Sequence, residues 1–189
     1  MPRGIARDHD EKRASLRKGA AAYFARFGYD RASMTGAARE CGISKALIYH
    51  YYDSKEALLF DILEAHLARL RDVVVGTGPD DLPALIAAIL EAYEDADSEH
   101  KLQIDALTTL PPEMQEPLVE LQRQMIATMS TALHTRRPDL TGDRLHALTM
   151  SVFGILNWYY MWKRPGKGLN RTDYAALAAD FVEGGLRGV

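Results

Sequence analysis

Side chains that donate hydrogen bonds are concentrated in one short stretch of the sequence, GISKALIYHYYDSKEALL, which covers residues 42–59. This stretch contains three tyrosines, one histidine and two lysines, whose phenol, imidazole and ammonium groups are donors. A helix that packs only against its own core carries aliphatic residues on one face and charges on the other. The composition of this stretch therefore indicates a hydrogen-bonding partner outside the chain.

Two short helices on either side of a glycine would position these groups. Ser33 can cap a helix over residues 34–41 that ends at Gly42, and Ser44 can cap a second helix over residues 45–51. This pair has the form of a helix-turn-helix, whose second helix lies in the major groove of double-stranded DNA. The stretch is therefore interpreted as a DNA-binding motif.

Each side chain of the second helix has a possible partner on DNA. Lys45 can donate to guanine acceptors, Leu47 can pack on a thymine methyl group, and Tyr49 can donate to a phosphate oxygen. Ile48 and Tyr52 are expected to face the core instead. The residues predicted to contact DNA are Ser33, Thr35, Ser44, Lys45, Ala46, Leu47, Tyr49, His50, Tyr51 and Lys55.

The rest of the chain shows helical periodicity, so the predicted fold class is all-α. Asp53 and Glu56 form a possible capping box at the start of a long fourth helix. The glycines and prolines of residues 75–83 interrupt the pattern, and a bundle of about five helices follows. The first helix is expected over residues 10–27, and those of the bundle over residues 82–97, 99–110, 112–136, 143–163 and 172–186.

The distribution of charge is asymmetric along the chain. The 189 residues carry a net charge of −3, but residues 1–75 sum to +3 and residues 76–189 to −6. A basic N-terminal part is typical of a protein that binds phosphates. The single cysteine, Cys41, excludes an intramolecular disulfide and a Cys-pair metal site, and no apolar run approaches the length of a membrane span. A cytoplasmic location, with no cofactor, metal or membrane partner, is expected.

An enzyme and a protein-interaction module are the alternatives to a DNA-binding protein. The six histidines are scattered, and HExxH, CxxC, GxSxG and glycine-rich phosphate-loop motifs do not occur, which argues against an enzyme. A helical protein-interaction module would explain the bundle. It would leave the polar, aromatic helix at residues 45–51 without a purpose.

The stretch over residues 33–52, followed by residues 54–58, resembles the DNA-binding signature of TetR-family transcriptional regulators, and the likeness covers about residues 10–75. Gly36, Ala37 and Tyr52 depart from the usual residues of the signature. The resemblance implies a homodimer that associates through its last two helices and presents two recognition helices to a palindromic operator. It also implies release of DNA when a small hydrophobic effector binds. The implied domains are a DNA-binding domain over residues 1–56 and a ligand-binding and dimerisation domain over residues 57–189.

The C-terminal half is similar to a TetR subgroup that controls phenylacetate and fatty-acid catabolism and senses acyl-coenzyme A (acyl-CoA) thioesters. That similarity implies a repressor with an apolar acyl site in the bundle and basic residues near its mouth that meet the phosphates of the coenzyme. A regulator of an efflux gene that senses a hydrophobic drug is the alternative. The candidate ligand-binding residues are Met125, Met129, Phe153, Asn157, Trp158, Trp162, Arg123, Lys163 and Arg164.

Overall fold

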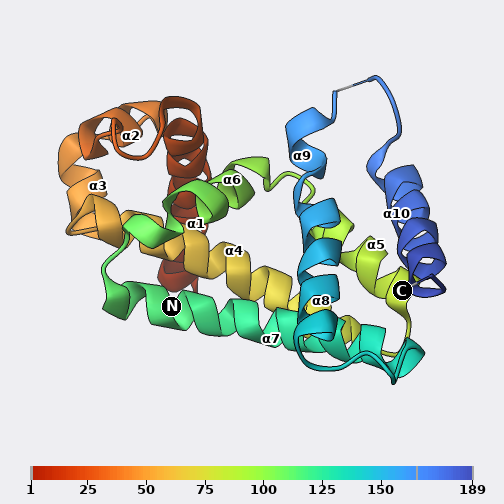
Figure 1. Cartoon of the computed structure of the whole chain (residues 1–189). Coiled ribbons are helices and arrows are strands. Elements are labelled where there is room, and N and C mark those ends of the chain that lie inside the picture. Colours follow the sequence, from red (N-terminus) through yellow and green to blue (C-terminus); the bar gives the residue numbers. More distant parts are fainter. Residues whose placement is uncertain (1, 165, 189) are drawn as a thin grey trace. The chain divides into compact units, whose positions relative to one another are not determined.

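The computed structural model describes residues 2–164 and 166–188, and the regular elements of these residues are all helices, which confirms the all-α prediction (Figure 1). An isolated bridge joins Arg164 to Lys167. The helices are α1 (Pro2–Phe27), α2 (Met34–Glu40), α3 (Lys45–Tyr51), α4 (Lys55–Thr77), α5 (Leu82–Ala92), α6 (Asp97–Ala106), the 3₁₀ turn η1 (Leu107–Thr109), α7 (Pro112–Arg136), α8 (Gly142–Asn157), α9 (Tyr159–Trp162) and α10 (Arg171–Leu186).

The chain forms two compact units. Unit 1 contains residues up to 66 together with residues 96–118, and unit 2 contains residues 67–95 and residues 119–189. The long helices α4 and α7 each contribute to both units. The domain division predicted between residues 56 and 57 stays a prediction.

Unit 1 has a core built on one face of α1. Leu16, Ala20 and Phe24 recur at helical spacing on this face and are each at most 5% exposed. Gly28 ends the helix with a φ of +81°, a conformation that glycine adopts without strain, and its N–H donates to the Phe24 carbonyl at 2.9 Å. Helices α2 and α6 pack against α1, and this packing supports the short helix pair α2 and α3.

Close packing of α1 on α2 requires glycine at position 36. A Cβ atom on Gly36 would lie 2.0 Å from the hydroxyl oxygen of Tyr23 and 2.4 Å from its Cζ atom. The Tyr23 ring therefore occupies the space that a larger residue would need. This contact explains a residue that is unfavourable inside a helix by its propensity.

Unit 2 is held together by contacts of α5 with α8 and α10. Asp81 caps α5 by accepting from the Ala84 N–H at 3.0 Å, and Asn170 caps α10 by accepting from the Asp173 N–H at 2.8 Å. The interior is aliphatic, and its side chains include Leu85, Ile86, Ile89, Leu90, Met129, Leu133, Val152, Leu156, Ala178 and Val182.

Several predicted helix boundaries are wrong. The cap of α4 is Ser54, whose hydroxyl accepts from the Ala57 N–H at 3.0 Å, and not Asp53. The helix predicted over residues 82–97 ends at Ala92, since Asp95 adopts a φ of +57° that a helix cannot contain. The helix predicted over residues 143–163 is divided at Trp158, whose N–H lies near the carbonyls of both Gly154 and Leu156. The predicted bounds of α3 and α7 are confirmed.

A membrane-spanning helix and a metal-binding cluster are both absent from the described ranges. No helix there has the length and apolarity that crossing a membrane requires. Likewise, residues 2–164 and 166–188 contain no group of three or more His, Cys, Asp or Glu side chains that could hold a metal ion.

Candidate nucleic-acid interface and ligand site

The α2 and α3 pair is shaped by two serine caps and a glycine turn, as predicted. Ser33 accepts from the Gly36 N–H and Ser44 accepts from the Leu47 N–H, both at 3.1 Å. Between the helices, Gly42 adopts a φ of +68°, and the Ile43 N–H donates to the Ala38 carbonyl at 3.0 Å. These local bonds set the angle at which α3 leaves the turn.

Helix α3 exposes the side chains that were predicted to contact DNA. Ile48 is fully buried and anchors the helix to unit 1, whereas Leu47 is 40% exposed and Tyr49 is 43% exposed. The Lys45 ammonium lies 5.8 Å from the centre of the Tyr49 ring. Lys45, Ala46 and His50 are exposed as well, as are Ser33, Thr35 and Ser44 at the two helix starts. Recognition of the major groove requires a helix whose exposed side chains can reach base edges and phosphates. The polar and aromatic surface of α3, with Ile48 as its buried side chain, has this form.

Two of the residues predicted to contact phosphates have partners inside unit 1. The ammonium group of Lys55 donates to the carbonyls of Tyr29 at 3.0 Å, Ala32 at 3.3 Å and Asp30 at 3.5 Å, and it lies 4.2 Å from the centre of the Tyr29 ring. Its position therefore stabilises the loop between α1 and α2. Tyr51 is half-buried, and its ring stacks on that of His9 at 4.9 Å.

Tyr52, which directly follows α3, is buried as predicted. It is 4% exposed, and its hydroxyl donates to Asp61 at 2.6 Å. Burial raises the pKa of the Tyr52 phenol, and the hydrogen bond to Asp61 and the charge of that carboxylate raise it further. The phenol is therefore a constant donor at neutral pH.

The predicted ligand-binding residues of unit 2 separate into an interior group and a surface group. Met125, Met129 and Phe153 lie in the interior and are each at most 9% exposed. Asn157, four residues after Phe153, accepts a hydrogen bond from the hydroxyl of Tyr93 at 2.7 Å. Burial raises the pKa of that phenol, so the bond joins two neutral groups.

The remaining members of the predicted ligand set lie at the surface. Trp158 is 58% exposed, and Trp162 is 46% exposed with its ring edge-on to those of Tyr159 and Tyr174. Arg123 is exposed and forms an ion pair with Glu120 at 3.5 Å. Arg164 is exposed, and the ammonium of Lys163 lies 6.0 Å from the centre of the Tyr159 ring.

A groove of about 620 Å³ runs between α5 and α10 in unit 2, and the sequence did not indicate it. The described residues that line it are Pro83, Ala84, Ala87, Glu91, Glu94, Asn170, Arg171, Thr172, Ala175, Ala176 and Ala179. The candidate ligand residues are not among them. Five of these eleven residues are alanines, which belong to no sequence motif, so the groove becomes visible only when α5 and α10 pack together.

Both parts of the chain match models of one family. Residues 16–62 match that of the bacterial regulatory proteins of the tetR family, and residues 76–186 match that of the tetracyclin repressor-like C-terminal domain. The chain belongs to the TetR family. It is therefore a DNA-binding transcriptional regulator with an N-terminal helix-turn-helix and a C-terminal helical domain.

Other TetR-family proteins match nearly the whole chain. The HTH-type transcriptional repressor Rv1474c of Mycobacterium tuberculosis is 30% identical, and the alignment covers 99% of each chain. The HTH-type transcriptional repressor KstR2 of the same species is 26% identical over 96% of each chain. The crystal structure of a TetR-family regulator from Bordetella parapertussis is 33% identical and superposes with a TM-score of 0.78, over 90% of this chain and 93% of that one.

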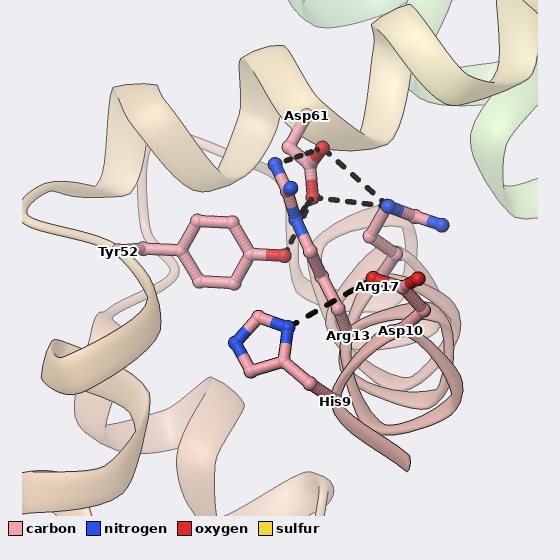
Figure 2. A network of polar contacts seen from close by, with 6 residues as sticks. All are labelled: His9, Asp10, Arg13, Arg17, Tyr52 and Asp61. Carbon is pink, nitrogen blue, oxygen red and sulfur yellow. Dashed lines mark hydrogen bonds and ion pairs between the residues drawn. The ribbon is translucent and has the colours of Figure 1, made fainter. Parts of the chain in front are cut away.

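Family membership assigns the exposed α3 to the helix-turn-helix, since α2 and α3 both lie inside the matched N-terminal range. The assignment to a family of regulators also places the chain outside the enzymes. Sequence reasoning missed Asp61, Arg13 and Arg17, which form one polar network with Tyr52 in unit 1 (Figure 2). An Asp inside the apolar stripe of α4 was the signal that could have indicated a buried polar contact.

Proposed function

We propose that this chain is a repressor that binds a palindromic operator as a homodimer and leaves it when a small hydrophobic effector binds. The exposed surface of α3 is the observation that carries the proposal. Lys45 and Leu47 at its N-terminal end would contact base edges, and Tyr49 would donate to the phosphate backbone. The relatives that match nearly the whole chain include the repressors Rv1474c and KstR2, which support this direction of regulation, and the activator FasR, against which the reporter experiment below discriminates.

The last two long helices supply a surface for dimerisation. On α10, Leu177 is 53% exposed and Phe181 is 67% exposed, and on α8 Met150 is 43% exposed. Large apolar side chains exposed at helical spacing mark an interaction surface. A symmetric dimer would bury them on both subunits, and its two α3 helices would match the two halves of a palindrome.

For the effector, we propose an acyl-CoA thioester. Met125, Met129 and Phe153 supply an apolar interior for the acyl group, and the pair of Tyr93 and Asn157 supplies a polar group at its edge. Arg123, Lys163 and Arg164 are the proposed partners of the coenzyme phosphates. A hydrophobic drug that binds the same interior is the second candidate, because methionine side chains adapt to many shapes.

DNA binding is tested with the purified full chain and fluorescent duplexes from its own promoter region, with a shuffled duplex of the same composition as the control. We expect the protein to bind a duplex that contains a palindrome and not the shuffled duplex. We also expect its affinity to fall steeply as the salt concentration rises. An affinity that depends neither on the salt concentration nor on the sequence of the duplex would contradict the proposal. In a reporter strain, loss of the gene should raise transcription from that promoter, and a fall would contradict repression.

The effector is tested by thermal unfolding with phenylacetyl-CoA, fatty acyl-CoA esters, free coenzyme A, the free acids and a panel of hydrophobic drugs. A ligand that binds the native state raises the melting temperature with its concentration. A rise with one thioester, but not with its acid or free coenzyme A, is expected. Phe153→Ala should abolish the rise, whereas Ala176→Trp, which fills the groove between α5 and α10, should leave it unchanged.

A further inference from the structure

Asp61 is a buried carboxylate in the middle of unit 1, where it accepts hydrogen bonds from three side chains (Figure 2). Arg13 contacts it with two nitrogens: Nε donates to Oδ2 at 3.0 Å and Nη2 donates to Oδ1 at 2.7 Å. The Arg17 Nη1 atom lies 3.5 Å and 3.4 Å from the two oxygens, and the Tyr52 hydroxyl donates to Oδ2 at 2.6 Å. At 6% exposure, the Asp61 carboxylate has little contact with water, so these three side chains supply its hydrogen bonds.

These contacts join three elements that are distant in the sequence. Arg13 and Arg17 belong to α1, Asp61 belongs to α4, and Tyr52 is the residue at which α3 ends. The Tyr52 N–H also donates to the Ile48 carbonyl at 3.0 Å, so the phenol is attached directly to the last turn of α3. A two-nitrogen Arg–carboxylate contact fixes the orientation of the carboxylate as well as its position. The C-terminal end of α3 is therefore tied to a rigid point.

We propose that Asp61 and Tyr52 are positioning residues for DNA recognition, which hold α3 at the angle that its base contacts require. The proposal rests on the proposed role of α3 as the helix that enters the major groove. Ile48 is the buried side chain of α3, and Tyr51 stacks on His9 of α1. The Tyr52 hydroxyl adds the hydrogen bond that ties the end of the helix to Asp61. Removing this hydroxyl loosens the last turn of α3 and allows the helix to tilt about Ile48.

Such a tilt would affect specific binding more than non-specific binding. Helix α3 has seven residues and is therefore about 10 Å long, so a rotation of its last turn moves Lys45 and Leu47 at the other end. Hydrogen bonds to base edges require these side chains in register, whereas attraction to phosphates depends mainly on charge. The ratio of specific to non-specific affinity is therefore the quantity that reports the position of α3.

The first variant is Tyr52→Phe, which removes one oxygen and keeps the buried ring. Tyr29→Phe is the matched control, because Tyr29 is a second buried tyrosine of unit 1 and belongs to the loop between α1 and α2. Fluorescence anisotropy would measure the affinity of each variant for the operator and for a shuffled duplex at several salt concentrations. We expect Tyr52→Phe to weaken operator binding about tenfold and shuffled binding less than about twofold, with the same salt slope. Tyr29→Phe should keep the wild-type ratio.

The second variant is Arg13→Lys, which keeps the positive charge but cannot make the two-nitrogen contact. If Arg13 acts by orienting Asp61, this variant lowers the specificity ratio as Tyr52→Phe does. If Arg13 instead met a DNA phosphate, lysine would maintain the ratio, and that result would overturn the proposal for Arg13. Circular dichroism of each variant shows whether it is folded before its affinity is measured.

Failure of this proposal is distinguishable from failure of the proposed function. A wild-type protein that does not prefer its operator over the shuffled duplex would contradict the assignment of α3 itself. A wild-type protein that does prefer it, together with an unchanged ratio in folded Tyr52→Phe and Arg13→Lys, would overturn the positioning role alone. An equal loss of affinity for both duplexes would overturn it as well.

Discussion

Replacement of Gly36 by alanine tests whether packing or helix propensity controls α2. By propensity alone, alanine inside a helix is about 1 kcal/mol more stable than glycine. In this structure the new Cβ atom would lie 2.0 Å and 2.4 Å from two atoms of the Tyr23 ring, closer than real Cβ contacts allow. To make room, the Tyr23 ring must turn away from α2, and it then loses its contact with Phe27, whose ring centre lies 5.0 Å away.

The expected result of Gly36→Ala is a loss of stability. Overpacking costs about 1–3 kcal/mol, so after the gain in propensity the net loss is up to about 2 kcal/mol. Urea unfolding followed by circular dichroism measures this loss as a lower midpoint. The same substitution in a Tyr23→Ala background should be stabilising, because the ring is gone. If Gly36→Ala raised the midpoint in the wild-type background, the packing argument would be refuted.

Four further predictions concern other parts of the chain. Phe181→Asp should prevent dimerisation in analytical ultracentrifugation, because a 67% exposed phenylalanine offers about 100–170 Å² on each subunit, worth about 2.5–4 kcal/mol per subunit. Lys55→Ala should lower the melting temperature, because the carbonyls of Tyr29, Asp30 and Ala32 each lose a hydrogen-bond donor. Tyr49→Phe should weaken operator binding and leave the melting temperature unchanged, because the Tyr49 side chain is exposed. Burial raises the pKa of Tyr52 and Tyr93 in the folded protein above about 10, the pKa of tyrosine in the unfolded chain. Below about pH 10 both phenols are protonated in both states, and the folded state keeps its full stability. As the pH rises further, the phenols ionise first in the unfolded chain, so the free energy of unfolding falls. Absorbance near 295 nm should show these two phenols ionising together with unfolding.

Features that depend on neighbouring residues were predictable from the sequence. Ser33 and Ser44 cap their helices as expected, because a cap involves residues three positions apart. The bounds of α7 follow from Pro112 at its start and Pro138 just beyond its end. The exposure of Tyr49 and the burial of Ile48 follow from their positions about 100° apart around a short helix.

Features that depend on distant residues were not predictable. The acceptors of Lys55 lie 23 to 26 positions away, so its spacing in the motif did not reveal that its ammonium lies over the loop between α1 and α2. Arg13 and Asp61 are 48 positions apart, and each appeared as an ordinary charge on its own helix. The sequence indicates Trp158 as a candidate ligand-binding residue, but the division of α8 from α9 leaves it at the surface.

The same contacts change the meaning of the charge count. Residues 1–75 sum to +3, which suggested attraction to phosphates, but that sum includes Arg13 and Arg17, which are held by Asp61, and Lys55, which is held by carbonyls. Charges that are already engaged contribute less to counterion release when DNA binds, so the salt dependence of the affinity should come mainly from the exposed basic residues, such as Lys45. Specific binding then depends on the placement of a few base contacts at the start of α3. A small change in the angle of α3 would then weaken binding to the operator more than binding to other DNA.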